Sequence, residues 1–362
     1  MTSIIKKIRP RRCQLSVPAS SKKMIEKAAS IKVDGVILDL EDSVAPDQKE
    51  SARHQIIDGL TQLNWRASSI SVRINATNTE WCHQDIIELV SNCSEKIATL
   101  IVPMVNTPND LLFVETLIKQ LAMKHSSATE IGLEGLIETV EGLSNVDEIA
   151  QSSEKLEALV LGMGDYAASQ RMRINTIGDV SSEAGDIWQY PRYRLIVACH
   201  ANGIHPIDGP YADIKDITGL KLDSKKTSLI GMMGKWAIHP DQVAPITEAF
   251  TLGKDIILTA KKQKTAYEKG LAEGLGSVSV DGVMVDAANA KTIDELFSDV
   301  KQIHFLSYLR YLYFNIGRMA YLQANVLSAY VFLAPAIVAG VVTLGVMQQI
   351  IRAFGRVEGL SL

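Results

Sequence analysis

The stretch IGLEGLIETVEGL, residues 131–143, can be interpreted as either of two elements. In an amphipathic helix, Glu134 and Glu138 would share one solvated face, because residues four apart lie on the same side of a helix. In a strand that stops near Glu138, this carboxylate would instead stand at the tip of the strand. Gly132 and Gly135 each destabilise a helix interior by about 1 kcal/mol relative to alanine. The two glycines therefore favour the strand, with Glu138 at its end.

The rest of the chain repeats this pattern of a short apolar run followed by a helix-like stretch. Strands that are mostly apolar and alternate with helices predict a parallel sheet covered on both faces. Eight such runs in series predict an α/β fold of the (β/α)8 TIM-barrel type, with a doubly wound open sheet as the alternative. The runs are QLSVPA (14–19), GVILDL (35–40), SISVRIN (69–75), TLIVPMV (99–105), IGLEGLIET (131–139), ALVLGMGD (158–165), IHPIDGP (204–210) and KWAIHP (235–240).

Composition limits the classes of protein that fit. The chain has 362 residues, of which 47% are hydrophobic, and a formal net charge of −4. This length suits one barrel of about 250 residues with extensions. The mild acidity gives no electrostatic basis for nucleic-acid binding. Four scattered cysteines without paired spacing favour free thiols in the cytoplasm, and the basic N-terminal stretch lacks the apolar core of a signal peptide.

Polar residues follow most of these runs at the point where each run is expected to end. The carboxyl ends of the strands meet at one face of a TIM barrel, and that face carries the chemistry. Carboxylates dominate the set, which packing alone does not require. The residues are Asp39, Glu41 and Asp42 after the second run, Arg73 and Asn75 after the third, Glu138 after the fifth, Asp165 after the sixth, Asp208 after the seventh and His239 after the eighth.

Several carboxylates at one barrel mouth would repel one another unless a cation lies among them. Mg²⁺ prefers oxygen ligands and typically binds one or two carboxylates together with water and substrate. Glu138 and Asp165 form the natural pair, because their strands are neighbours. Arg73 offers a fixed cationic fork for a carboxylate or a developing oxyanion. His239 fits catalysis and a structural hydrogen bond equally well, and Glu134, which shares strand parity with Glu138, fits either support of this site or a buried polar network.

The first expected strand-to-helix turn, VPASSKK (17–23), suits a phosphate group. Ser20 and Ser21 could cap a helix whose N-terminus faces the barrel mouth, and backbone N–H groups there attract anions. Lys22, Lys23 and Lys27 would add positive charge. A plain capped helix with solvated lysines explains the same residues.

Several short motifs, taken together and in order, form a highly specific set. They resemble the citrate lyase β-subunit-like branch of the HpcH/HpaI aldolase superfamily, and within it the malyl-CoA/β-methylmalyl-CoA lyases. The resemblance runs from about Arg11 to about Ile303. The motifs are RRCQLSVPASS, DGVILDLEDSVAPDQKESAR, SVRIN, LIETVEGL, LEALVLGMGDYAAS, IDGPYADIKD, GKWAIHPDQ and VDGVMVDAA.

This resemblance implies a Mg²⁺-dependent barrel, with Mn²⁺ as a substitute, that makes or breaks a C–C bond between a CoA thioester and a 2-oxo acid. The expected reaction joins acetyl-CoA or propionyl-CoA to glyoxylate, or cleaves (3S)-malyl-CoA or β-methylmalyl-CoA. The enzymatic alternatives are a citramalyl-CoA lyase, a malyl-CoA thioesterase and a citrate lyase β subunit. The alternative outside catalysis is a membrane-attached acyl-CoA-binding protein. A homotrimer or homohexamer is expected.

The resemblance also implies roles for individual residues. Glu138 and Asp165 would hold the metal, and Arg73 would contact the substrate carbonyl or carboxylate. Asp286, in VDGVMVDAA, matches the catalytic aspartate of a C-terminal segment that reaches over a neighbouring subunit's site.

Other matched positions have supporting roles. Asp39, Glu41 and Asp42 would order metal-bound water, and capping of the following loop is the alternative for the last two. Relatives often carry a basic residue near the position of Ser21, whereas this chain has its charge at Lys22 and Lys23. Contacts with CoA or substrate are expected at Ser16, Lys22, Lys27, Arg73, Gly164, Asp165, Ile238 and His239.

The C-terminal part falls outside this resemblance. Residues 319–351 contain no charged side chain, and VLSAYVFLAPAIVAGVVTLGVM (326–347) is long enough to cross a bilayer, which takes about 20 apolar residues. The tail resembles a fragment of bacterial peptide-antibiotic uptake transporters. We favour a gene-fusion product over a membrane anchor or a buried helix of an oligomer. The expected organisation is a catalytic barrel at 1–252, a lid for a neighbouring subunit's site at 253–303 and the tail at 304–362.

Overall fold

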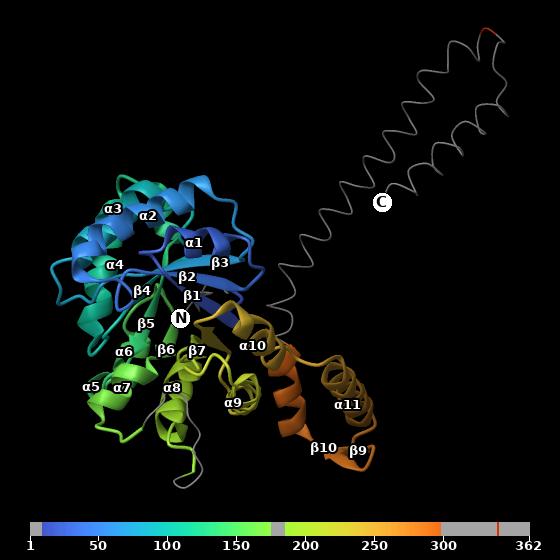
Figure 1. The fold of residues 1–362 in the computed structure, drawn as a ribbon. Helices are drawn as coiled ribbons and strands as arrows, with labels where there is room; N and C mark the ends of the chain where they lie inside the picture. The colour runs from blue at the N-terminus through green and yellow to red at the C-terminus, as the bar shows by residue number, and fades with distance from the viewer. Residues whose placement is uncertain (1–8, 175–184, 298–338, 340–362) are drawn as a thin grey trace. The chain divides into compact units, whose positions relative to one another are not determined.

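The computed structural model describes residues 9–174, 185–297 and 339 (Figure 1). The chain divides into two compact units, Met1–Leu258 and Thr259–Leu362. The described part of the first unit contains a β-barrel with its helices, and that of the second contains helices and a β-hairpin.

Eight parallel strands of the first unit form a closed barrel, in which each strand pairs with the next and β8 pairs with β1. An open doubly wound sheet would leave an unpaired edge on its two outermost strands. The TIM-barrel prediction is therefore confirmed and the open-sheet alternative is wrong. The strands are β1 (Cys13–Pro18), β2 (Gly35–Asp39), β3 (Ser69–Arg73), β4 (Thr99–Val102), β5 (Gly132–Ile137), β6 (Leu156–Leu161), β7 (His205–Asp208) and β8 (Gly234–Ala237).

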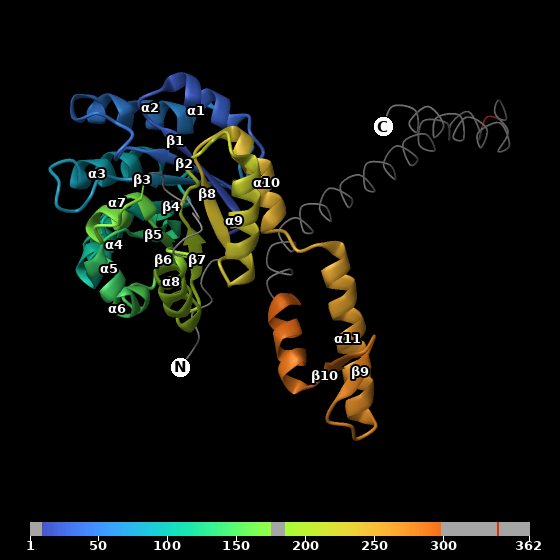
Figure 2. The same cartoon turned by 60° about the horizontal axis from the view of Figure 1, so that its bottom comes forward.

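Helices alternate with the strands and lie around the outside of the barrel, as Figures 1 and 2 show. Local sequence explains where two of them begin. Ser21 accepts a hydrogen bond from the backbone N–H of Met24 at the start of α1, and Thr107 and Asp110 form a capping box before α4. The α-helices are α1 (Lys22–Ala29), α2 (Lys49–Gln62), α3 (Cys82–Cys93), α4 (Pro108–Ala122), α5 (Val140–Ser144), α6 (Val146–Gln151), α7 (Met163–Ser169), α8 (Gln189–Ala201), α9 (Ile217–Leu229) and α10 (Val243–Ala249). The short 3₁₀ helices are η1 (Pro46–Gln48), η2 (Ser126–Glu130) and η3 (Pro240–Gln242).

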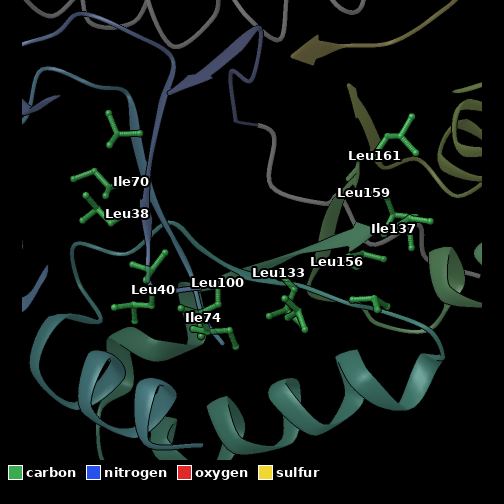
Figure 3. Close-up of a cluster of buried hydrophobic side chains, with 14 of the residues drawn as sticks. Leu38, Leu40, Ile70, Ile74, Leu100, Leu133, Ile137, Leu156, Leu159 and Leu161 are labelled. Atoms are coloured by element: carbon green, nitrogen blue, oxygen red, sulfur yellow. The ribbon is translucent and has the colours of Figure 1, made fainter. Parts of the chain in front are cut away.

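Alternate residues of several strands, including β2, β4 and β6, enter two different cores. The larger core lies between the barrel and its helices, and Figure 3 shows part of it, including Leu38 and Leu100. The smaller core includes their neighbours Ile37 and Ile101, which point to the other side of the strands. Its members are Ile37, Ile101, Leu136, Ala158, Val160, Ile207 and Trp236. The barrel interior is thus packed, as in other TIM barrels.

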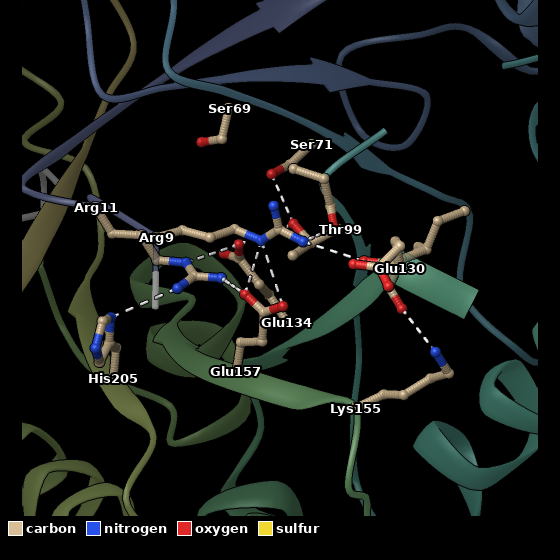
Figure 4. Close-up of polar contacts among 12 residues, drawn as sticks. Arg9, Arg11, Ser69, Ser71, Thr99, Glu130, Glu134, Lys155, Glu157 and His205 are labelled. Carbon is tan, nitrogen blue, oxygen red and sulfur yellow. Dashed lines mark hydrogen bonds and ion pairs between the residues drawn. The ribbon is translucent and has the colours of Figure 1, made fainter. Parts of the chain in front are cut away.

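A polar network lies toward the N-terminal end of the barrel (Figure 4). Glu134 accepts hydrogen bonds from Arg11 Nε at 3.0 Å, Gln14 Nε2 at 3.0 Å and Thr99 Oγ1 at 2.9 Å. Arg11 also pairs with Glu157. Of the two interpretations of Glu134, the buried polar network is therefore the one that the structure supports.

The second unit contains an antiparallel hairpin of β9 (Val278–Val280) and β10 (Val283–Val285), preceded by α11 (Lys254–Ala272), which begins in the first unit. Asp281 and Gly282 turn the hairpin with φ angles of 51° and 80°, as a two-residue turn with left-handed residues requires. No helix in the described ranges is long and apolar enough to cross a membrane. The predicted hydrophobic tail at 304–362 lies outside those ranges, apart from residue 339.

Candidate active site

Arg73, the last residue of β3, lies beside Asp39, the last residue of β2, with which it is paired in register. Arg73 Nε donates to Asp39 Oδ1 and Nη2 donates to Oδ2, both at 2.6 Å. Burial opposes ionisation of Asp39, but this double contact holds its pKa below the ordinary value. The guanidinium group is therefore fixed in orientation at the carboxyl end of the barrel.

The loop after β2 brings two more carboxylates to the same guanidinium group. Arg73 Nη1 lies 2.8 Å from Glu41 Oε2 and 3.3 Å from Asp42 Oδ2. The indole ring of Trp236, on β8, has its centroid 5.8 Å from Arg73 Cζ, within the range of a cation–π contact. The pKa of Glu41 is raised to about 7, mainly because the side chain is buried. The charge of Arg73 lowers this pKa and the charge of Asp42 raises it.

Glu138 directly follows β5, where the sequence predicts it, and only 2% of its surface is exposed. Its Oε1 accepts a 2.6 Å hydrogen bond from the backbone N–H of Met104. Met104 has a φ of 52°, a left-handed conformation that is uncommon for residues other than glycine. Backbone strain of this kind concentrates at functional sites, where the surrounding structure maintains it.

Gly162, between β6 and α7, is a site residue that the sequence analysis missed. A Cβ atom at this position would lie 2.4 Å from Glu138 Cβ and 2.5 Å from Glu138 Oε2. Glycine is therefore required here because the backbone passes directly against the carboxylate. The signal in the sequence was the first glycine of GMGD, which adjoins the predicted acid Asp165.

Asp165 corrects one prediction about secondary structure. The sixth strand ends at Leu161, and Asp165 lies on an exposed position in the first turn of α7. It is nevertheless electrostatically part of the same site. The pKa of Glu138 is raised to about 8, mainly by burial and also by the charges of Glu41 and Asp165, while the N–H of Met104 and the charge of Arg73 lower it. Although Asp165 is exposed at its surface, partial desolvation at the mouth and the charge of Asp42 raise its pKa, and the charge of Arg73 opposes them.

Burial and the neighbouring carboxylates both disfavour the charged forms of Glu138 and Asp165. A divalent cation held by these two side chains would favour the charged forms, and both present the hard oxygen atoms that Mg²⁺ and Mn²⁺ prefer. Within the described ranges, no three His, Cys, Asp or Glu side chains are grouped to hold a metal ion. The oxygen donors of Glu138 and Asp165 fit an ion such as Mg²⁺, which usually retains water and substrate oxygens as ligands.

Ile238 and His239, beyond β8, take part in local backbone structure. The N–H of Ile238 donates to Gln242 Oε1 at 2.9 Å, and His239 Nδ1 accepts from the N–H of Asp241 at 3.2 Å. His239 therefore makes the structural hydrogen bond that was one of its two interpretations. Contact of either residue with substrate stays a prediction.

The first strand-to-helix turn forms the predicted capped helix. Ser21 is the N-cap of α1, and Lys22 and Lys27 are exposed on that helix. Ser16 lies in β1 between two residues of the outer core, and it therefore faces the barrel interior. Contacts of these residues with CoA stay predictions, as does that of Gly164, in α7.

Asp208 corrects another prediction, because its side chain does not join the polar ring at the mouth. It follows Ile207, an interior residue, and so turns outward toward the helices. Arg192 Nε and Nη2 donate to its two oxygens at 3.0 Å, and Lys235 Nζ donates at 2.5 Å. Arg192 and Lys235 also pair with Asp223, and all four side chains are fully buried. Asp208 thus belongs to an outer ion-pair network.

Asp286 lies in the second unit, directly after β10. Its Oδ1 accepts hydrogen bonds from the N–H groups of Ala288 at 3.0 Å and Asn289 at 3.1 Å, and its own N–H donates to Asn289 Oδ1 at 3.2 Å. This reciprocal pattern caps the helical segment that begins at residue 287. A structural role thus stands beside the predicted catalytic one.

Comparison with known proteins adds family relationships to this geometry. The family described as HpcH/HpaI aldolase/citrate lyase matches residues 12–240, and the SbmA/BacA-like family matches residues 257–361. The L-malyl-CoA/β-methylmalyl-CoA lyase of Rhodobacter capsulatus is 37% identical over 290 residues, covering 77% of this chain and 91% of the relative. The protein of the same name from Cereibacter sphaeroides is 34% identical over 305 residues, covering 82% and 96%. A structure of the citrate lyase beta subunit from M. tuberculosis, complexed with oxaloacetate and magnesium, is 26% identical with a TM-score of 0.54, covering 67% of this chain and 98% of that one.

Proposed function

The chain belongs to the HpcH/HpaI aldolase/citrate lyase family, and from this premise we propose that it is a Mg²⁺-dependent carbon–carbon lyase. Its proposed substrate is (3S)-malyl-CoA or β-methylmalyl-CoA, cleaved to glyoxylate and acetyl-CoA or propionyl-CoA. The two relatives that bear this activity in their names align over 91% and 96% of their lengths. The observation that carries the proposal is a fixed Arg73 guanidinium group in the electrostatic field of Glu138 and Asp165 at the barrel mouth.

In this proposal, Glu138 and Asp165 hold Mg²⁺, which when bound acts as a Lewis acid for the oxygen atoms of the 2-hydroxy or 2-oxo acid. Asp39 holds the Arg73 fork in place through two hydrogen bonds. Arg73 stabilises the negative charge that develops on oxygen as the C–C bond breaks. Glu41 and Asp42 order water beside the metal.

We further propose that Asp286 acts from a neighbouring subunit as general acid and base. In cleavage, the hydroxyl group loses its proton to water at the barrel mouth, its oxygen becomes the carbonyl oxygen of glyoxylate as the C–C bond breaks, and the electron pair of that bond passes to the α-carbon of the departing thioester. Asp286 in its protonated form donates a proton to that carbon. In the condensing direction, its carboxylate removes the same proton. This role requires a homo-oligomer, a trimer or hexamer, which light scattering of the purified protein can test.

The direct test is an assay of CoA-thioester formation from acetyl-CoA or propionyl-CoA with glyoxylate, in the presence and absence of Mg²⁺. Formation of malyl-CoA or β-methylmalyl-CoA that depends on Mg²⁺ is expected. Pyruvate in place of glyoxylate distinguishes a citramalyl-CoA lyase, and release of free CoA from malyl-CoA distinguishes a thioesterase. Absence of product with every pair, from folded protein that binds Mg²⁺, would contradict the proposal.

We propose that the enzyme works in the cytoplasm and that the tail at 304–362 is a fused segment rather than an anchor. The SbmA/BacA-like match already begins at residue 257, within α11. Fractionation of cells expressing the full chain tests this point. Recovery of the protein in the membrane fraction would contradict it.

A further inference from the structure

Helix α2 carries two buried cations that the proposed reaction does not use. Lys49, its first residue, is only 6% exposed. Its Nζ donates to the backbone carbonyl groups of Leu40 and Glu41, both at 2.7 Å, and lies 5.5 Å from the centroid of the Trp81 ring. A buried ammonium group is costly to desolvate, so its two short hydrogen bonds hold this loop firmly.

Leu40, whose carbonyl group Lys49 contacts, is also bonded to the backbone of Arg73. The N–H of Leu40 donates to the carbonyl oxygen of Arg73 at 2.9 Å. The next residue, Glu41, places its carboxylate 2.8 Å from Arg73 Nη1. Lys49 therefore supports Arg73 at two points, its main chain and one edge of its guanidinium group.

Arg53 lies one helical turn beyond Lys49, on the same face of α2. It is 4% exposed, and its Nε donates to Oδ1 of the fully buried Asp85 at 2.9 Å. The other oxygen of Asp85 accepts hydrogen bonds from the N–H of Asn75 at 3.0 Å and from its Nδ2 at 2.7 Å. Asn75 follows Arg73 by two residues, so this chain of contacts fixes the backbone on the other side of Arg73.

We infer that Lys49 and Arg53 are positioning residues for Arg73. Together they tie one rigid helix to the chain on both flanks of the proposed oxyanion-stabilising group. A displacement of about 1 Å in such a group can reduce a rate about 100-fold, which is the physical reason for supporting it so closely. The inference rests on the proposed function only in assigning Arg73 to the reaction.

The experiment uses the full chain with Lys49→Met, which keeps the length of the side chain but removes its charge. We expect about tenfold faster amide hydrogen exchange in residues 39–44 and a loss of about 10- to 100-fold in kcat. The KM for glyoxylate should rise while that for acetyl-CoA stays unchanged, because only the oxo acid depends on Arg73. Lys49→Arg should bring amide exchange and kcat most of the way back to their wild-type values. Lys221→Met, at an exposed position of α9, should change neither.

A purely structural role predicts a different result. If Lys49→Met lowers the melting temperature but leaves kcat and both KM values unchanged, the inference is wrong. If Lys49→Met fails to fold, the test uses Lys49→Arg and Arg53→Lys instead. A positioning role predicts an altered KM for glyoxylate in at least Arg53→Lys. Unchanged kcat and KM values in both variants would overturn the inference. If the wild-type protein has no lyase activity, the proposed function fails. The inference is then tested by amide hydrogen exchange of the variants in residues 39–44 and 73–77. Exchange that is unchanged from wild type overturns the inference.

Discussion

Replacement of Gly162 by alanine tests how the site holds Glu138. The new Cβ atom would lie 2.4 Å from Glu138 Cβ and 2.5 Å from its Oε2, far inside normal contact distance. The backbone itself does not forbid alanine, because Gly162 has φ of −81° and ψ of 82°. Without the contact, a Gly→Ala change at such a position would stabilise the protein by about 0.4–1 kcal/mol. A destabilising result would therefore report the contact with Glu138 rather than the backbone.

The clash can be relieved in two ways, and both disturb the proposed metal site. Glu138 can move away, which breaks its 2.6 Å hydrogen bond from the N–H of Met104. Alternatively, the start of α7 can move and carry Asp165 with it. Overpacking of this kind costs about 1–3 kcal/mol of folding free energy. Displacement of a metal ligand through its supporting contacts typically costs about 10- to 100-fold in metal affinity.

The assay combines urea unfolding of the metal-free protein with calorimetric titration of Mg²⁺. Gly253→Ala is the matched control, because nothing lies within 4 Å of the Cβ it would add. That variant should unfold within about 0.5 kcal/mol of wild type and bind Mg²⁺ normally. If Gly162→Ala unfolds like the control and binds Mg²⁺ with wild-type affinity, the reasoning about the position of Glu138 is refuted.

Three further predictions concern the proposed chemistry. Asp286→Asn should keep the helix cap, because asparagine also accepts N–H bonds, but should lower kcat by about 10²–10⁴-fold with Mg²⁺ and CoA still bound. Asp286→Ala should in addition destabilise the cap by about 1 kcal/mol. Near-wild-type turnover of Asp286→Asn would rule out proton transfer by Asp286. The metal-free protein should lose stability as pH rises from about 5 to about 8, because Glu138 and Glu41 have folded-state pKa values of about 8 and about 7 against an unfolded value of about 4.3, so that the folded state binds the extra protons. Glu138 should contribute a slope of up to about 1.4 kcal/mol per pH unit to the unfolding free energy, and Glu138→Gln should remove this contribution and leave that of Glu41. Arg73→Lys should lose the double contact with Asp39 and reduce kcat by about 10²–10³-fold in steady-state assays, whereas a loss below about threefold would argue against a role for the planar fork.

The barrel could be predicted from sequence because its strands are buried on both sides and are therefore mostly apolar. The same property hides where a strand stops. The run ALVLGMGD continues past Leu161 into α7, so Asp165 was expected at a strand tip and lies in a helix instead. Gly162 was missed for a related reason, since its partner Glu138 comes from the preceding strand and only the folded barrel brings the two together.

The direction in which a side chain at a strand end points was harder to predict than the strand to which it belongs. Asp208 ends its strand as Asp39 does, yet one side chain points outward and the other toward the mouth. Its partner Arg192 lies 16 residues before Asp208 in the chain, and its partner Lys235 lies 27 residues after it. Sequence spacing gives no indication that these charges meet. The buried network around Glu134 was left open for the same reason, since Arg11 is 123 residues away.

Charge balance separates the structural clusters of this barrel from its proposed active site. The network at the N-terminal end pairs two guanidinium groups with two carboxylates, from Arg9, Arg11, Glu134 and Glu157. The outer network likewise pairs three cations with three carboxylates, from Arg192, Lys226, Lys235, Asp186, Asp208 and Asp223. At the mouth, the guanidinium group of Arg73 faces an excess of carboxylates, from Asp39, Glu41, Asp42, Glu138 and Asp165. The raised pKa values of about 7 and 8 appear at Glu41 and Glu138, which belong to this unbalanced cluster. Folding alone would favour balance there too, so the surplus negative charge is best explained by a cation that binds during function.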